Sequence, residues 1–383
     1  MWKTVLPGIA MIAVTYALAR YSFGLFLPEI STALNLSEGQ AGVVGSAAYI
    51  AYTLALVTAS VFIRKFSARP IVLLSGATAF IGMLGMAASH NFYALAVSAF
   101  VAGLGSGWVS PAFSQVVTQS LAADLKDKGN TWINTGTSFG VVITGPVALM
   151  FSEHWRWGYV LFAAFAFVTY WWNARVIESR KQETSATSND QFKFSSFAQV
   201  RFMVLAATGI GFGSSIYWTF SRSYLTAVHD FSVNESIIFW IVMGAAGIIG
   251  GLAGALIRSI GLSWSYRLGV LVVTASLVCL TIPYSAAIFL SAGFFGISFI
   301  FMTGLFIVWG TRHFPTTPAV GVSLSFFALG IGQSIGSAVA GVLIEEMSYT
   351  FAFLAFALVA LLFIFCRTAA TPVSSTEYAV HKV

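Results

Sequence analysis

The sequence predicts an all-α membrane protein with twelve transmembrane helices, arranged as two pseudo-symmetric six-helix bundles. Composition is the first reason: 58% of the 383 residues are hydrophobic and only 8% are charged, whereas a soluble domain carries roughly 25% charged residues. The second reason is that apolar runs of about 20 residues, the length at which a helix crosses the hydrocarbon core, recur along the chain. The third is that the basic residues gather on one side of these runs.

The apolar runs are too long for strands and lack the two-residue alternation of a membrane β-barrel. The first run is too long for a signal-peptide core and no cleavage site follows it, so we expect it to remain as the first span. Cys279 and Cys366 lie within or at the end of apolar runs and indicate neither a disulfide framework nor a metal site. The twelve predicted spans are 5–27, 41–63, 70–88, 92–120, 131–152, 157–174, 201–221, 235–257, 266–283, 286–310, 318–344 and 349–366.

One long polar stretch, rich in Ser, Thr and charged residues, divides the spans six and six and reads as a linker. The predicted domains are therefore an N-terminal bundle at 1–174, a linker at 175–200, a C-terminal bundle at 201–366 and a tail at 367–383. Two short segments repeat at an offset near 195: residues 30–42 resemble 225–236, and 60–67 resemble 254–261. Because each half has an even number of spans, the repeat is parallel in the membrane.

The basic residues predict the orientation. All 19 Lys and Arg residues except Arg20, Arg156 and Arg222 fall on the face that carries both tails and the linker, so both termini are expected in the cytoplasm. The net charge of +6 is explained by this asymmetry, and we expect no nucleic acid as a partner. The expected partners are the lipid bilayer and a small-molecule substrate, with no cofactor, no metal and a monomeric protein.

Arg20 is the most informative residue, because it lies well inside the first apolar run, and the only Asp or Glu within the bounds of a predicted span is Glu235, the first residue of 235–257. A charge at this depth costs about 2.5–3.5 kcal/mol on insertion scales and marks a functional site by default. Its side chain leans back toward the membrane midplane, with Tyr16 one turn away on the same face. We expect Arg20 to hold an anionic ligand with Tyr16 and Gln115 nearby. The structural alternative is that Gln115, hydroxyls, carbonyls or an aromatic face satisfy it.

Further polar and aromatic residues complete the predicted substrate site, since binding pockets are mostly apolar with a few polar groups. They are Tyr49, Asn134, Tyr217, Trp218 and Gln333. Arg222, near the outer end of span 7, is expected to extend to the membrane interface, with attraction of anions as the alternative.

Glu29, at the predicted outer mouth, is the candidate for ion coupling. A protonated substrate or substrate exchange are the other coupling modes left open. The chain contains no visible nucleophile–base pair, metal cluster or nucleotide-binding loop, so neither an enzyme nor an ATP-driven protein is expected.

Residues 19–30 (ARYSFGLFLPEI) and 103–114 (GLGSGWVSPAFS) are similar to the YbfB/YjiJ-like bacterial branch of the major facilitator superfamily, which the chain resembles over its whole length. The resemblance implies a multi-pass secondary transporter of the bacterial inner membrane that works by alternating access, with its site near the midplane between the halves. It also implies cytoplasmic gate residues: Arg64, Lys65, Arg69 and Arg258. Arg64 and Arg258 stand where the family carries an Asp, so the acid that pairs across this gate is missing.

Together these observations predict transport of a small organic anion, either a carboxylate or an amphipathic aromatic acid. Two alternatives stay open. One is an efflux pump for lipophilic compounds, in which Arg20 is structural and the aromatic residues bind the substrate. The other is a membrane sensor that binds a ligand and transports nothing.

Overall fold

The structure is a computed structural model that describes residues 1–178, 197–251, 253–314 and 318–368, and the described part is helical with no strand. The N-terminal half contains α1 (Trp2–Ile12), η1 (Ala13–Tyr21), α2 (Ser22–Leu34), α3 (Glu38–Phe66), α4 (Ala68–Ala88), α5 (Phe92–Ser120), η2 (Ala123–Leu125), α6 (Lys126–Asn134), α7 (Gly136–Phe151), η3 (Ser152–His154) and α8 (Trp155–Val176). The C-terminal half contains α9 (Phe197–Val228), α10 (Val233–Gly250), α11 (Ala253–Leu280), α12 (Ser285–His313), α13 (Pro318–Glu346), α14 (Tyr349–Leu362) and η5 (Phe363–Phe365).

In the described part of the chain, each predicted apolar run falls mainly on helix, which confirms the all-α fold class. Ten stretches of the described chain are long and apolar enough to cross a bilayer. One of them, 128–176, joins the fifth and sixth predicted spans, and the last predicted span falls on the shorter apolar helix Tyr349–Phe365. The predicted linker and tail lie largely outside the described residues, so the number twelve and the domain boundaries remain predictions.

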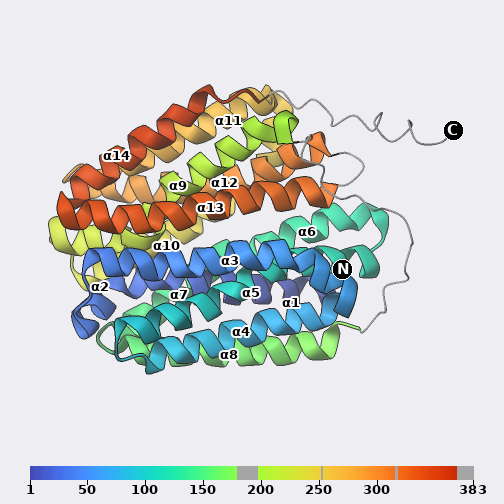
Figure 1. The fold of residues 1–383 in the computed structure, drawn as a ribbon, viewed down its shortest axis with the longest axis horizontal. Coiled ribbons are helices and arrows are strands. Elements are labelled where there is room, and N and C mark those ends of the chain that lie inside the picture. The colour runs from blue at the N-terminus through green and yellow to red at the C-terminus, as the bar shows by residue number, and fades with distance from the viewer. Residues whose placement is uncertain (179–196, 252, 315–317, 369–383) are drawn as a thin grey trace.

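The two halves form two side-by-side bundles. Figure 1 shows α1–α8 together in the lower half of the view and α9–α14 in the upper half, with most helices running along the long axis. The start of α1 and the end of α14 lie at the same end of the molecule, which we call the linker end. The opposite end, where α2 ends and α3 begins, is called the Glu29 end.

The internal repeat is visible in the backbone at matching positions. Asn35 and Asp230 end their helices with positive φ angles of 51° and 53°, and Asn and Asp tolerate this conformation better than most residues. Ser37 and Ser232 then cap α3 and α10, each in a capping box with the residue three positions later. The two residues of each pair are 195 positions apart in sequence. The same capping chemistry therefore begins α3 in one half and α10 in the other.

The halves approach closely at the Glu29 end, where glycines allow one backbone to lie against another. A methyl group on Gly24 of α2 would collide with the Trp218 carbonyl oxygen of α9, and one on Gly42 of α3 would collide with the Ser337 carbonyl oxygen of α13. Close contacts of this kind are typical of packed membrane helices. The interface between the halves is therefore tight at this end.

Candidate functional site

Arg20 lies near the end of η1, a nine-residue π-helical segment in the middle of the first long helix. A π-helix pairs residues five apart, whereas an α-helix pairs residues four apart, and such segments are frequent at functional sites. The wider turn brings Tyr16 and Tyr21 to the same side, so both flank Arg20. A regular α-helix would place Tyr16, but not Tyr21, on the same face as Arg20, so the sequence predicts Tyr16 alone.

Four tyrosine rings surround the Arg20 guanidinium. Its central carbon is 4.3 Å from the ring centre of Tyr52, 4.5 Å from Tyr21, 4.7 Å from Tyr16 and 5.5 Å from Tyr49. Electron-rich ring faces attract a cation, more strongly once it is desolvated, and Arg20 is only 5% exposed. The tyrosines therefore account for much of the stability of this buried charge.

The guanidinium keeps unused hydrogen-bonding capacity. It donates from Nη1 to the Ser106 hydroxyl (3.3 Å) and from Nη2 to the Tyr21 hydroxyl (2.5 Å). Its Nε has no hydrogen-bond partner, and no carboxylate of the described residues forms an ion pair with it. Since a guanidinium has five N–H donors, Arg20 can accept an external anion without losing its present contacts.

Arg20 also lines a cavity of about 410 Å³ between the two halves. Hydroxyl and amide groups from the N-terminal half face apolar side chains from the C-terminal half, and none of the described lining residues is an Asp or Glu. Arg258 of α11 also lines the cavity and, unlike Arg20, is exposed. Polar lining residues are Tyr16, Tyr21, Tyr52, Ser110, Thr131, Asn134, Thr135, Thr137, Ser138 and Thr303, and apolar ones include Phe299, Ile300, Ile307, Val308, Phe326 and Leu329.

Of the predicted substrate-site residues in the N-terminal half, Tyr16 and Asn134 line the cavity and Tyr49 is one of the four tyrosines around Arg20. Gln115 does not line the cavity. The α5 residues that face Arg20 and Tyr16 are Ser106 and Ser110, whose hydroxyls contact the Arg20 guanidinium and the Tyr16 hydroxyl. Gln115 is nine residues beyond Ser106, which places it about half a turn away on the helix surface.

The predicted residues of the C-terminal half occupy different positions. Tyr217 points into its own bundle, where it bonds to the Ser291 hydroxyl (2.8 Å) and stacks on Phe295 (3.8 Å between ring centres). Trp218 stacks on Tyr21 of the other half at 4.0 Å. Gln333 is fully buried beside the Tyr21 hydroxyl.

Sequence reasoning missed Tyr21, Ser106 and Ser110. For the two serines the available signal was their four-residue spacing on one face of span 4.

The four predicted gate residues lie at the linker end but have different surroundings. Arg64 and Lys65 are exposed at the end of α3. Arg69 donates to the Ala174 carbonyl (2.6 Å) and so ties α4 to α8 within one bundle. Arg258 alone of the four lines the cavity.

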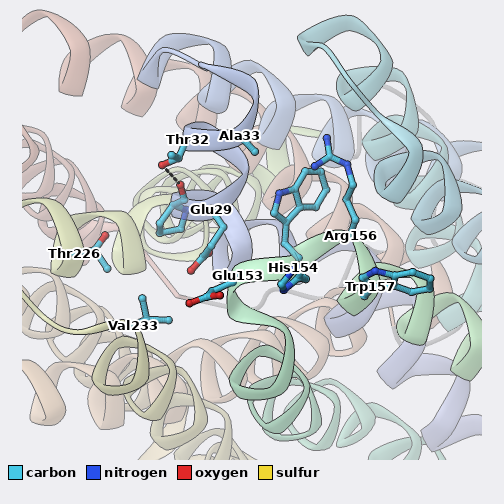
Figure 2. A pocket seen from close by; sticks show the side chains of 11 residues that line it. Glu29, Thr32, Ala33, Glu153, His154, Arg156, Trp157, Thr226 and Val233 are labelled. Atoms are coloured by element: carbon cyan, nitrogen blue, oxygen red, sulfur yellow. Dashed lines mark hydrogen bonds between the residues drawn. The ribbon is translucent and has the colours of Figure 1, made fainter.

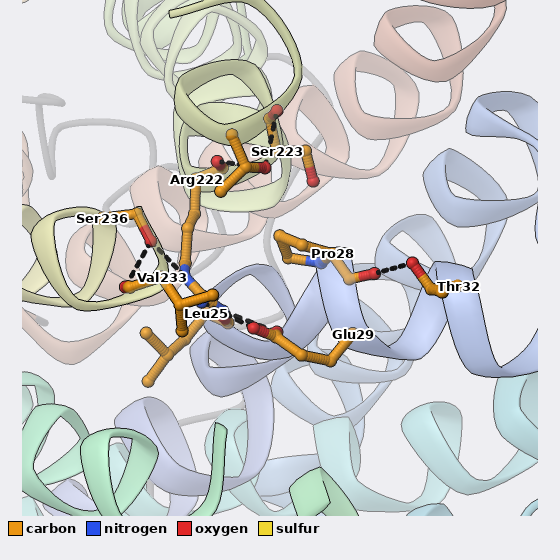
Figure 3. Close-up of polar contacts among 9 residues, drawn as sticks. Leu25, Pro28, Glu29, Thr32, Arg222, Ser223, Val233 and Ser236 are labelled. Carbon is orange, nitrogen blue, oxygen red and sulfur yellow. Dashed lines mark hydrogen bonds and ion pairs between the residues drawn. The ribbon is translucent and has the colours of Figure 1, made fainter. Parts of the chain in front are cut away.

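At the Glu29 end an ion pair joins the halves (Figure 3). Arg222 of α9 is 0% exposed and donates from both Nη atoms to the two carboxylate oxygens of Glu29 of α2, each at 2.6 Å. It also donates to the Ser236 hydroxyl (3.0 Å) and to the Leu25 carbonyl. The expectation that Arg222 extends to the membrane interface is therefore wrong, because its side chain is fully buried and bonded to Glu29. The two residues are 193 positions apart in sequence.

Other polar contacts join the same ends of the two halves. The Glu345 carboxylate accepts from the Ser37 hydroxyl (2.9 Å) and the Gly39 N–H (2.7 Å), and the Tyr349 hydroxyl donates to Glu38 (2.5 Å). This end is thus closed by several contacts between the bundles, whereas the cavity extends from Arg20 toward Arg258 at the linker end.

The ion pair borders a second pocket, of about 620 Å³, on the Glu29 end. It is lined by Glu29, Glu153, His154 and Arg156 among others, and Figure 2 shows the carboxylates of Glu29 and Glu153 pointing into the same space. Two residue layers separate this pocket from the cavity: the stacked rings of Tyr21 and Trp218, then the ion pair. Trp218 and Arg222 are one turn apart on α9, whereas Tyr21 at the end of η1 and Glu29 on α2 are about two turns apart.

A search with family models matches residues 9–329 to the model described as Major Facilitator Superfamily. Among solved structures, a mutant of the nucleoside transporter NupG is similar with a TM-score of 0.78 and 13% sequence identity, over 94% of this chain and 98% of that chain. A D-xylose-proton symporter matches with a TM-score of 0.76 and 14% identity, over 96% and 98%. A peptide transporter POT in complex with sulfate matches with a TM-score of 0.75 and 14% identity, over 94% and 92%. No curated protein sequence matches.

Proposed function

Because the chain belongs to the major facilitator superfamily, we propose that it moves a small organic anion across the membrane by alternating access, with Arg20 as the residue that holds the anion. That the protein is a membrane transporter and not an enzyme follows from the family and the similar structures. The substrate class rests on one observation: a buried guanidinium with unused N–H groups lines a cavity whose described residues include no carboxylate.

The chemistry of the cavity favours a carboxylate, or an acid with an aromatic ring. A carboxylate can accept two parallel hydrogen bonds from a guanidinium, which Lys could not provide in the same geometry. Phe299, Phe326 and Leu329 offer apolar surface for the rest of the molecule. Arg258, exposed beside the cavity, adds positive charge that attracts anions toward it.

Orientation and coupling complete the proposal. We place the linker end in the cytoplasm of a bacterium, which the positive-inside pattern of the sequence supports; the cavity then faces inward and the Glu29 end faces outward. Glu29 remains the coupling candidate: a proton on its carboxylate would remove the negative charge that pairs with Arg222 and favour separation of the halves at the outer end. The YbfB/YjiJ-like branch remains a prediction.

The test compares purified protein with Arg20→Gln and with Arg175→Gln, in which an exposed arginine beside Trp171 is changed in the same way. A thermal-shift screen of organic anions reports binding, because a ligand stabilises the folded state in proportion to the logarithm of its concentration over Kd. We expect hits whose affinity falls at least about 30-fold in Arg20→Gln, since losing a charged hydrogen-bond partner costs about 2 kcal/mol or more. The Arg175→Gln variant should bind as the parent does.

Two results would contradict this proposal, and each would favour one of the alternative functions. Stabilisation by neutral or cationic lipophilic compounds, unchanged in Arg20→Gln, would favour the efflux alternative, which the apolar lining of the cavity also suits. Binding of an anion through Arg20 without uptake or counterflow in sealed proteoliposomes would favour a sensor.

A further inference from the structure

Several buried polar atoms near Arg20 have no hydrogen-bond partner among the described residues. They are Arg20 Nε, Ser138 Oγ, Trp218 Nε1 and both amide atoms of Gln333. Gln333 is 0% exposed and Trp218 is 4% exposed. Native structures leave few buried polar atoms unpaired, and each such atom calls for an explanation. A bound substrate would supply the missing partners.

Gln333 belongs to the opposite half and lies beside the Tyr21 hydroxyl, behind the residues that line the cavity. It follows Leu329, a cavity-lining residue, by one turn on α13, so the two share a helix face. Gly330 of the same helix packs against the Tyr52 ring, and Tyr52 is the tyrosine closest to the guanidinium. The Tyr21 hydroxyl, which accepts from Arg20, lies beside Gln333. The order across the interface is therefore guanidinium, tyrosine hydroxyl, then amide.

Trp218 reaches the same place from α9. Its ring stacks on Tyr21 at 4.0 Å and meets Phe299 edge-on at 5.2 Å, and both of these neighbours line the cavity. The indole N–H is a donor only, whereas the Gln333 amide can both donate and accept. Both side chains lie against Tyr21, and between them they offer the donor and the acceptor that a hydroxyl group needs, since a hydroxyl accepts and donates through one oxygen.

We infer that Gln333 and Trp218 form a second substrate subsite that binds a hydroxyl group, so that the transported anion is a hydroxy acid. This inference rests on the proposed function, because Arg20 binds the carboxylate of the same molecule. The carboxylate contacts the N-terminal half and the hydroxyl contacts the C-terminal half. A substrate with both groups bridges the halves as they close around it, and an acid without the hydroxyl leaves the amide unpaired.

The experiment uses matched acids that differ in their hydroxyl groups: benzoate against 3- and 4-hydroxybenzoate, and cyclohexanecarboxylate against quinate. Their Kd values are measured by calorimetry on the purified full-length protein, on Gln333→Leu and on Gln115→Leu. The last variant removes an amide from a transmembrane helix at a position about half a turn away from Ser106, the α5 residue that contacts Arg20. We expect the parent and Gln115→Leu to prefer at least one hydroxylated acid by tenfold or more over its partner.

In Gln333→Leu this preference should fall to within about twofold, while the affinity for the unhydroxylated acid is unchanged. Trp218→Phe, which keeps an aromatic ring and loses the N–H, should lower the preference only in part. The ligand-free Gln333→Leu protein should also melt at a higher temperature than the parent, because an unpaired buried amide is gone. A melting point below the parent's would mean that the amide is paired within the protein and would overturn the inference.

The results separate this inference from the anion proposal. If acids bind through Arg20 with no preference for hydroxyl groups, or with a preference that survives Gln333→Leu, the hydroxyl subsite is refuted and the anion proposal stands. If none of the acids binds and Arg20→Gln changes no ligand response, the anion proposal fails and the subsite falls with it.

Discussion

The ion pair between Glu29 and Arg222 should hold the two halves together at the Glu29 end, and its removal has a calculable effect. Breaking a buried ion pair by removing one partner costs about 3–5 kcal/mol, because the other charge stays buried and uncompensated. In Glu29→Gln the remaining charge is Arg222, which is 0% exposed, and the new amide oxygen can still accept one hydrogen bond. We therefore take the lower limit, about 3 kcal/mol, which corresponds to a shift of about 150-fold toward conformations open at this end.

Removing the other partner of the ion pair should shift the population toward open conformations by a smaller factor. Arg222→Gln leaves Glu29 without its partner, but Glu29 is 14% exposed and borders the pocket of Figure 2, so water can reach its carboxylate. An unsatisfied group with this access costs closer to about 1–2 kcal/mol. The two substitutions should thus shift the population of open conformations unequally, and Glu29→Gln should give the larger shift.

The assay is labelling of a buried reporter cysteine in detergent, where both ends of the protein meet solvent. Cys279 and Cys366 are replaced by Ser, and Ser337→Cys introduces the reporter. Ser337 is fully buried between the halves, where its hydroxyl contacts Thr219 and the Gly42 carbonyl. Reaction with a maleimide then proceeds only through conformations open at the Glu29 end, so its rate follows their population.

We expect labelling about 150-fold faster in Glu29→Gln and a smaller increase in Arg222→Gln. Labelling should be slow again when the charges are exchanged in Glu29→Arg with Arg222→Glu. Glu153→Gln is the matched control, because it removes a carboxylate from the same pocket without breaking an ion pair. Parent-like labelling of Glu29→Gln, or equal acceleration by Glu153→Gln, would refute the reasoning.

Two further predictions concern helix contacts. Gly24→Ala should also speed labelling of the reporter cysteine, because the new methyl group would collide with the Trp218 carbonyl oxygen across the interface. The control Gly293→Ala, where no atom lies within 4 Å, should leave the labelling rate unchanged. Equal labelling rates in the two variants would contradict the contact between Gly24 and Trp218. Arg69→Gln should lower the free energy of unfolding by about 1–3 kcal/mol through loss of the hydrogen bond to the Ala174 carbonyl. It should leave reporter labelling unchanged, because both groups belong to one half. Faster labelling would instead support the predicted role of Arg69 in the cytoplasmic gate.

The sequence was sufficient for the properties that depend on composition and local pattern. Long apolar runs must become helices because the bilayer offers no hydrogen bonds to the backbone, and this accounts for the success of the all-α prediction. Capping sequences such as those at Ser37 and Ser232 act over three residues and can be read directly. The isolation of Arg20 from acidic residues in the apolar runs was equally visible, since it depends only on which residue types are present.

The sequence could not predict contacts that depend on where distant helices meet. The partner of Arg222 is Glu29, in the other half of the chain, and no local pattern links these positions. The position of Gln115 outside the cavity lining has a related cause, because the face of α5 that meets Arg20 is set by the packing of two helices.

For this protein, the sequence alone determined the helical membrane fold, the internal repeat and the buried arginine, because each follows from short-range chemistry and the energetic demands of the bilayer. The tertiary structure decided what surrounds that arginine: four tyrosine rings and the Ser106 hydroxyl, with the buried amide of Gln333 from the other half behind the Tyr21 hydroxyl. It also decided that the Glu29 end is closed and that the cavity extends to the linker end. These features depend on how the two bundles pack against each other. The same sequence is compatible with more than one such packing, so local sequence patterns do not specify it.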